Sequence, residues 1–218
     1  MIILCTHNDG GVGKTTLAVH IAGVLLSRGD SVLLVDCDDQ ADLWQFFTKG
    51  KTPTQSKDSE DLENSKLIWD KDKGSLKGKA NPAYFDHVVL DIDTPLQNTV
   101  QVILGNDPDL ILVPINKSQK KKALRNLPRT LKVISKLESK IGFNPKVIIV
   151  PLGIPAESVE DVVSRIPSDE KPRNCRTASQ MPDLQDEIQD AIYEEYQYIW
   201  DDEQHQELYS YFAEFIED

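Results

Sequence analysis

The chain has 218 residues, 39% of them hydrophobic, which suits one compact α/β domain. Its formal net charge of −12 excludes a general polyanion binder, so any contact with nucleic acid must come from a local basic surface. Three widely separated cysteines, Cys5, Cys37 and Cys175, form neither a disulfide framework nor a metal-binding spacing, which favours a reducing, cytoplasmic environment. No apolar run approaches the length of a membrane span, and a strand rather than a signal peptide is predicted at the start.

Predicted strands and helices alternate through the first two thirds of the chain. Apolar runs and helical periodicity predict, in order, a strand at 1–6, a helix at 14–28, strands at 31–36 and 85–91, a helix at 96–104, a strand at 110–115, a helix at 118–140 interrupted at Pro128, and a strand at 146–150. Residues 48–80 are polar and predict a surface excursion with one short strand near 67–69. This order predicts a single domain over 1–218 with a doubly wound, mostly parallel sheet, helices on both faces, and ligands at the carboxyl ends of the strands.

The pattern weakens after residue 151. A short helix is predicted at 158–165, and an acidic helical part over 183–218 contains helices at 183–200 and 203–216. Because Asp and Glu dominate its polar positions, it is a poor candidate for an interfacial membrane helix. We expect its aromatic residues to pack the helices onto the sheet, with an exposed partner-binding surface as the alternative: Tyr193, Tyr196, Tyr198, Trp200, Tyr209, Tyr211, Phe212 and Phe215.

A glycine-rich segment, residues 8–16, joins the first predicted strand to the first predicted helix. A phosphate-binding loop requires this context, because glycine backbones allow successive N–H groups to face phosphate oxygens at a helix N-terminus. Lys14 would neutralise β/γ-phosphate charge and the Thr15 hydroxyl would ligate Mg²⁺. The alternative is a glycine-rich turn without a ligand. The residues predicted to bind nucleotide here are Gly10, Gly11, Val12, Gly13, Lys14, Thr15 and Thr16.

Residues 10–15 resemble the "deviant" Walker A loop, KGGxGK[ST], of the ParA/MinD family of positioning ATPases, whose fold is that of the P-loop NTPases. The family's signature lysine, which reaches the partner's phosphates in a nucleotide-sandwich dimer, falls at Asp9. A carboxylate beside a triphosphate has the wrong sign, so either Asp9 turns away or another residue supplies the cation. Lys117, just after the strand at 110–115, is the candidate for that phosphate contact. In lacking the lysine the chain is similar to the carboxysome-distribution subgroup, McdA.

Two acidic segments extend this resemblance, which covers about residues 1–151. Residues 35–42 are similar to the family's D-x-D-P-Q segment, which implies that Asp38 lies near the Mg²⁺ and orients the attacking water, and that Asp42 belongs to the first switch region. The strand at 85–91 ends in Asp91, which matches the Walker B carboxylate that holds Mg²⁺ through water; Asp93 would be a further acid behind it. The resemblance therefore implies Lys14 and Asp38 as catalytic residues, and Thr15, Asp38 and Asp91 as metal-site residues.

Residues 117–140 contain nine lysines and arginines and a single acid, Glu138. The run is either a solvated face or a sequence-nonspecific DNA surface, for which we predict Lys120, Lys121, Lys122, Arg125 and Arg129. The histidines, His7, His20, His87 and His205, are scattered, and we expect them to be exposed or partly packed.

The resemblance implies a cytoplasmic, nucleoid-associated ATPase that uses ATP and Mg²⁺. It would form a homodimer with ATP, bind DNA nonspecifically in that state, and position a carboxysome or plasmid through an adaptor or centromere-binding partner. Two alternatives remain open: an ATP-binding switch that scarcely hydrolyses ATP, and a MinD-like ATPase that cycles on membranes.

Overall fold

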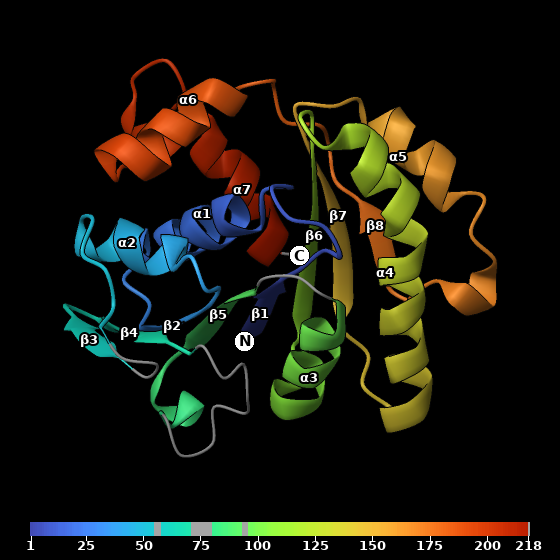
Figure 1. The fold of residues 1–218 in the computed structure, drawn as a ribbon, viewed down its shortest axis with the longest axis horizontal. Helices are drawn as coiled ribbons and strands as arrows, with labels where there is room; N and C mark the ends of the chain where they lie inside the picture. The colour runs from blue at the N-terminus through green and yellow to red at the C-terminus, as the bar shows by residue number, and fades with distance from the viewer. Residues whose placement is uncertain (55–57, 71–79, 93–95, 218) are drawn as a thin grey trace.

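The computed structural model describes residues 1–54, 58–70, 80–92 and 96–217. Its centre is an eight-stranded sheet with the strand order β3-β4-β2-β5-β1-β6-β7-β8 (Figure 1). All neighbouring strands run parallel except β3, which pairs antiparallel with β4 at one edge. The strands are β1 (Ile2–Cys5), β2 (Val32–Cys37), β3 (Ser59–Leu62), β4 (Ser65–Trp69), β5 (His87–Ile92), β6 (Leu110–Asn116), β7 (Lys146–Leu152) and β8 (Cys175–Thr177).

Helices cover both faces of the sheet, which confirms the predicted doubly wound fold (Figure 1). The central strands are apolar at consecutive positions because successive side chains point to opposite faces and both faces are covered. In β1, for example, Ile3 and Cys5 belong to one core cluster and Leu4 to the other. Helices α1 (Lys14–Ser27), α2 (Asp42–Thr48), α6 (Gln185–Gln189) and α7 (Leu208–Glu217) pack in the first cluster, and α3 (Leu96–Asn106), α4 (Lys120–Ile141) and α5 (Ala156–Val163) in the second.

Helix α4 runs without interruption through Pro128, so the predicted break there is wrong. A proline lacks the N–H that would bond four residues back, which weakens a helix at that point. Here the inner face of α4 is buried against the sheet through Ala123, Leu127, Leu131 and Ile134. This apolar packing holds the helix together across the missing hydrogen bond.

Within the predicted surface excursion at 48–80, the short strand expected near 67–69 is confirmed as β4, but β3, which pairs with it as a hairpin at the edge of the sheet, was not predicted. Strand β4 pairs with β2, and Leu67 and Ile68 are buried. The composition misled the prediction because only one short stretch of the hairpin is apolar, whereas Ser59, Glu60 and Asp61 of the edge strand are polar. Helix α2 and strand β8 were not predicted.

The C-terminal helices are shorter than predicted. Helix α6 continues as a wider, π-helical turn, Asp190–Glu195, which ends at Tyr196, whose φ of 55° cannot continue a helix. A 3₁₀ turn, Ile199–Asp201, follows, and α7 begins at Leu208. Two further 3₁₀ turns, Pro82–Tyr84 and Ser168–Glu170, complete the described elements.

Seven of the eight aromatic side chains of the C-terminal part share a core cluster with the sheet but reach it through α1 and α2, whereas Tyr193 is exposed and lies outside the cluster, so the expected core packing is wrong for Tyr193. Phe212 stacks on His20 of α1, with ring centroids 4.6 Å apart, and Tyr198 lies 5.2 Å from Phe46 of α2. A Cβ at Gly23 would come within 2.4 Å of the Tyr198 ring, so this contact needs glycine in α1. In the part of the chain that the structure describes, none of the helices combines the length and apolarity of a membrane span.

Candidate nucleotide-binding site

The glycine loop leaves the carboxyl end of β1 and leads into α1. Gly11 and Gly13 have φ angles of 67° and 103°, which favour glycine, and a Cβ at Gly13 would lie 2.5 Å from the Leu152 side chain. Helix α1 begins at Lys14 with no side chain capping its first turn. The first N–H groups of any helix lack an intrahelical partner, and here no side chain at the N-cap accepts from them. This is the usual arrangement at an anion-binding helix N-terminus.

A polar cavity of about 360 Å³ lies over this helix start. It brings together two segments that are separate in the sequence, the glycine loop and the connection from β2 to α2. Val12 of the predicted set does not line the cavity, because its side chain is buried in the core. The lining residues are Gly10, Gly11, Gly13, Lys14, Thr15, Thr16, Asp38, Asp39, Gln40, Asp42 and Tyr193.

Two buried carboxylates lie side by side at the carboxyl ends of neighbouring strands, Asp36 on β2 and Asp91 on β5. The Asp36 oxygens accept hydrogen bonds from the N–H groups of Asp38 (2.9 Å) and Trp44 (2.8 Å). No group among the described residues lies in good hydrogen-bond geometry with the Asp91 oxygens, although the Thr15 hydroxyl is near enough to lower the pKa of Asp91.

Burial raises the pKa of Asp91 to about 7, although Thr15 and Lys14 oppose the rise. Burial, and then the charge of Asp91, raise the pKa of Asp36 well above its usual value. Because two buried acids repel each other and the single nearby charge of Lys14 does not balance both, this pair fits a site next to a divalent cation. No group of three or more His, Cys, Asp or Glu side chains in the described segments could hold a metal by itself. Magnesium, which keeps several waters and takes phosphate oxygens as ligands, does not require one.

Asp38 and Asp42 line the same polar cavity as Lys14. The Asp38 carboxylate accepts the Gln40 N–H at 2.9 Å, and its carbonyl accepts the indole N–H of Trp69 at 2.8 Å, so the loop is fixed on both sides. Burial raises the pKa of Asp42, as does the charge of Asp38, while a hydrogen bond from the Tyr193 hydroxyl lowers it. The predicted acid at Asp93 lies outside the described residues.

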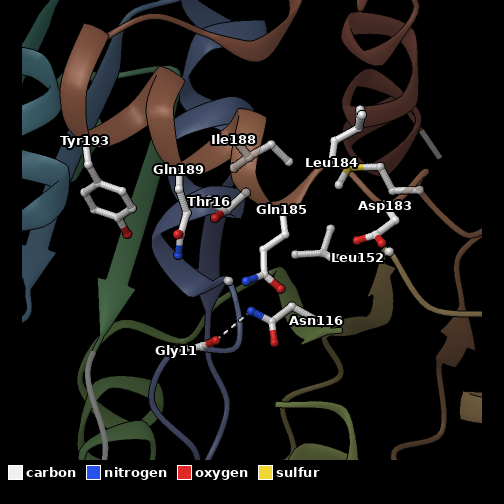
Figure 2. Close-up of a pocket in the computed structure, with 13 residues that line it drawn as sticks. Gly11, Thr16, Asn116, Leu152, Asp183, Leu184, Gln185, Ile188, Gln189 and Tyr193 are labelled. Atoms are coloured by element: carbon white, nitrogen blue, oxygen red, sulfur yellow. Dashed lines mark hydrogen bonds between the residues drawn. The ribbon is translucent and has the colours of Figure 1, made fainter. Parts of the chain in front are cut away.

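A second, more apolar pocket of about 90 Å³ adjoins the glycine loop (Figure 2). Gly11, Gly13, Thr16 and Tyr193 line both this pocket and the polar cavity. Asn116, at the end of β6, donates to the Gly11 carbonyl at 2.6 Å and thereby joins the pocket to the loop. Its other lining residues are Leu152, Gly153, Met181, Asp183, Leu184, Gln185, Ile188 and Gln189.

The sequence predicted the glycine-loop residues of this apolar pocket but none of its other lining residues. Most of them follow β7 or belong to α6, where the sequence pattern is weak and no motif marks a ligand. Asn116 offered one signal, since it is a polar residue directly after a predicted buried strand. Tyr193 offered none, because it was grouped with the aromatics expected in the core.

Asp9 is turned away from the polar cavity and toward α4. Asn126 donates to both of its carboxylate oxygens at 2.9 Å, and Lys122 pairs with it at 3.2 Å. This is the first of the two alternatives considered for an acid at the signature-lysine position.

Lys117 lies directly after β6, as predicted, but its ammonium group pairs with Asp183. That hydrogen bond and the charge of Asp183 raise the pKa of Lys117. Asp183 lines the apolar pocket, so Lys117 lies at its rim and not in the polar cavity. Its contact with phosphate remains a prediction.

The basic residues of α4 point away from the buried face of the helix. Lys121, Lys122, Arg125 and Arg129 are exposed, whereas Lys120 is half-buried and donates to the Ser158 hydroxyl at 3.1 Å. Four of the five predicted DNA-binding residues, Lys121, Lys122, Arg125 and Arg129, thus form one exposed basic strip, of which Lys122 is also paired with Asp9, whereas Lys120 lies at its edge.

Two of the four histidines are buried, so the expectation of exposed or partly packed histidines is wrong for His7 and His20. His20 lies one helical turn after Thr16, bonds to the Thr16 carbonyl at 2.7 Å and accepts the Ile199 N–H at 3.1 Å. Burial lowers the pKa of His20 to about 4, so the ring is neutral at pH 7. It links the glycine-loop helix to the C-terminal part of the chain.

Comparisons with known proteins agree with this site. Residues 3–171 match the model of the CobQ/CobB/MinD/ParA nucleotide binding domain, whereas no curated protein matches the chain. The fold is similar to that of apo McdA from Cyanothece, with a TM-score of 0.74 at 19% identity over 99% of this chain and 98% of that one.

Two further structures share the fold. The complex of a Cyanothece McdA D38A variant with ATP gives a TM-score of 0.73 at 19% identity, covering 99% of this chain and 95% of that one. The MinC:MinD cell division complex of Aquifex aeolicus gives 0.66 at 20% identity, covering 100% of this chain and 96% of that one. Since the matched domain spans most of the chain, and the glycine loop, paired acids and sheet order occur together in it, this protein belongs to the CobQ/CobB/MinD/ParA family of nucleotide-binding proteins.

Proposed function

We propose that this chain is an ATP-hydrolysing dimerisation switch of the ParA/MinD type, which binds DNA nonspecifically in its ATP state and positions a cargo through an adaptor protein. The cargo would be a carboxysome or a plasmid. The McdA-like fold and the acid at position 9 both favour the carboxysome-distribution subgroup.

The observation that carries the proposal is the pair of cavities joined at the glycine loop. A nucleoside triphosphate has a charged triphosphate at one end and a flat, largely apolar base at the other. The polar cavity and the apolar pocket, which meet at the glycine loop, match these two ends. The triphosphate would bind the unpaired N–H groups at the start of α1 and the Lys14 ammonium. The adenine would enter the pocket between Leu152 and Ile188, with amide groups of Asn116, Gln185 and Gln189 at its edge.

The unpaired Asp91 carboxylate supports a magnesium site beside the phosphates. Thr15, Asp91 and Asp38 would hold the ion directly or through water. When bound, Mg²⁺ would neutralise phosphate charge, which is a large part of phosphoryl-transfer catalysis. Asp38 would orient the attacking water, and it lines the same cavity as Lys14.

The exposed strip on α4 supports the DNA part of the proposal. Lys121, Lys122, Arg125 and Arg129 are exposed along a helix whose other face is buried, as expected of a surface that contacts successive phosphates, and the half-buried Lys120 lies at the start of the same helix. No base-reading helix pair accompanies the strip in the sequence, so we expect binding without sequence preference.

A titration of a fluorescent ATP analogue tests the nucleotide site. Lys14→Ala should weaken binding at least about tenfold, because a charged hydrogen bond contributes about 1.5–3 kcal/mol. The matched control is Lys66→Ala, which removes the same charge from the β3–β4 edge, where Lys66 pairs with Asp61. Equal affinity in all three proteins would refute the glycine loop as the phosphate site.

A further inference from the structure

The Asp9 carboxylate is held by α4. It is 3% exposed and accepts hydrogen bonds from Asn126 at 2.9 Å, while the paired Lys122 ammonium, 3.2 Å away, belongs to a side chain that is 53% exposed. A buried carboxylate is stable only when it is paired and hydrogen-bonded. The glycine loop and the basic strip therefore share one ion pair, with one end inside the protein and the other at its surface.

The backbone of Asp9 is bound to the nucleotide machinery. Lys14 Nζ donates to the Asp9 carbonyl at 3.1 Å, and the Asp9 N–H donates to His7 Nδ1 at 3.0 Å. Burial lowers the pKa of His7 to about 4, so this ring is neutral and does not compensate the Asp9 charge. A triphosphate at the loop would draw Lys14 away from that carbonyl and repel the Asp9 carboxylate. Both effects act on the residue that holds Lys122.

We propose that Asp9 is a positioning residue that couples the nucleotide site to the basic strip: without nucleotide it holds Lys122, and with ATP it releases Lys122 to the phosphates of a polyanion. This inference rests on the proposed function for the identity of both ligands. Lys132 provides a natural comparison, because it pairs with Glu170, outside the glycine loop.

The measured quantity is the coupling ratio, the Kd for a DNA duplex without nucleotide divided by the Kd with ATP and Mg²⁺. Asp9→Asn keeps an amide that can bond Asn126 but frees Lys122. It should tighten nucleotide-free DNA binding, by up to about eightfold in 0.1 M salt for one added phosphate contact, and bring the ratio toward one. Glu170→Gln is the matched control, since it also frees a lysine of α4; it should tighten binding in both states and preserve the ratio.

Lys122→Gln removes the other partner of the Asp9 ion pair and tests the same coupling ratio. Its side chain is half-exposed, so the variant should fold even if Asp9→Asn does not, and it should lose DNA affinity mainly in the ATP state. Hydrogen exchange of α4 amides provides a readout without DNA: ATP should alter exchange near Lys122 and Asn126 in the wild type and in Glu170→Gln, but not in Asp9→Asn.

The outcomes separate the two proposals. If the wild type binds no ATP, the proposed function fails at the nucleotide site. If it binds ATP but no DNA, the proposed function fails at the DNA step, and the hydrogen-exchange measurement still decides whether Asp9 couples the nucleotide site to α4. If the wild type binds both ligands with a ratio above one, and Asp9→Asn and Lys122→Gln keep both that ratio and the ATP-dependent exchange, the coupling through Asp9 is refuted and the proposed function stands.

Discussion

His20 ties the glycine-loop helix to the C-terminal part of the chain, and replacing it with leucine tests that tie. Leucine has about the size of histidine and fills the site beside Phe212, but it neither donates to the Thr16 carbonyl nor accepts the Ile199 N–H. Leaving one buried donor unpaired costs about 1–3 kcal/mol. At pH 7 we therefore expect His20→Leu to lower the free energy of unfolding by about 2 kcal/mol.

The pH dependence gives this prediction a second, independent magnitude. The folded-state pKa of His20 is about 4 against an ordinary value of 6.5. Its stabilising contribution is therefore complete above pH 6.5 and is lost as the pH falls toward 4, because the unfolded chain takes up a proton first. By about pH 4.5 the wild type should have lost about 3 kcal/mol from this group, at about 1.4 kcal/mol per pKa unit. The leucine variant has no such loss, so at about pH 4.5 its deficit of about 2 kcal/mol should disappear and the variant should be more stable than the wild type by about 1 kcal/mol.

Urea unfolding followed by far-ultraviolet circular dichroism at about pH 7 and about pH 4.5 measures both effects. The acid sensitivity of His7 is common to both proteins and cancels in the difference. The control is His205→Leu, in a partly exposed turn, which should change the free energy of unfolding little and equally at both pH values. A deficit of His20→Leu that is the same at both pH values would refute a buried, neutral His20.

Three other predictions concern the proposed activity. Asp38→Ala should keep ATP affinity within about threefold while phosphate release falls at least about a hundredfold. Normal phosphate release in this variant would show that Asp38 is only an acidic loop residue. A wild type that binds ATP without releasing phosphate would favour the non-hydrolysing switch. Reversing Lys120, Lys121 and Lys122 to glutamate should abolish DNA binding in gel shifts while the protein still binds ATP, and wild-type DNA binding should weaken steeply with salt. Unchanged shifts would indicate that the strip is only a solvated face. Lys117→Ala should weaken ATP-dependent dimerisation several-fold in light scattering, and an unchanged dimer would leave Lys117 as the partner of Asp183 alone.

The sequence predicted the parts of the fold in which one local signal dominates. Continuous apolar runs identified β1, β2, β5, β6 and β7, because parallel strands buried on both faces need no alternation. The edge strands β3 and β8 lack this signal, since they gain much of their stability from pairing with a neighbour along the sheet. Pro128 misled the prediction for the opposite reason: a strong local breaker was overruled by tertiary packing of α4.

The candidate site likewise has a part that the sequence predicted and a part that it did not. The meeting of the glycine loop and Asp38 at one polar cavity could be predicted, because phosphate and Mg²⁺ chemistry restricts residue types at fixed spacings, while the binding roles of these residues and of Asp91 stay predictions. The apolar pocket could not be, since its walls come from Leu152, Ile188 and Tyr193, which become neighbours only in the folded chain. The orientation of Asp9 depends on Asn126, more than a hundred residues away, and so on tertiary structure as well.

A crystal structure of the Asp38→Ala variant with ATP and Mg²⁺ tests the central claim most directly, because this variant should bind the nucleotide without consuming it. We predict phosphates on the backbone N–H groups of Gly11–Thr15 with Lys14 against them, Mg²⁺ between Thr15 and the Asp91 carboxylate, and adenine in the pocket beside Leu152 and Ile188. A nucleotide bound elsewhere, or phosphates on the glycine loop with the metal remote from Asp91, would contradict the account.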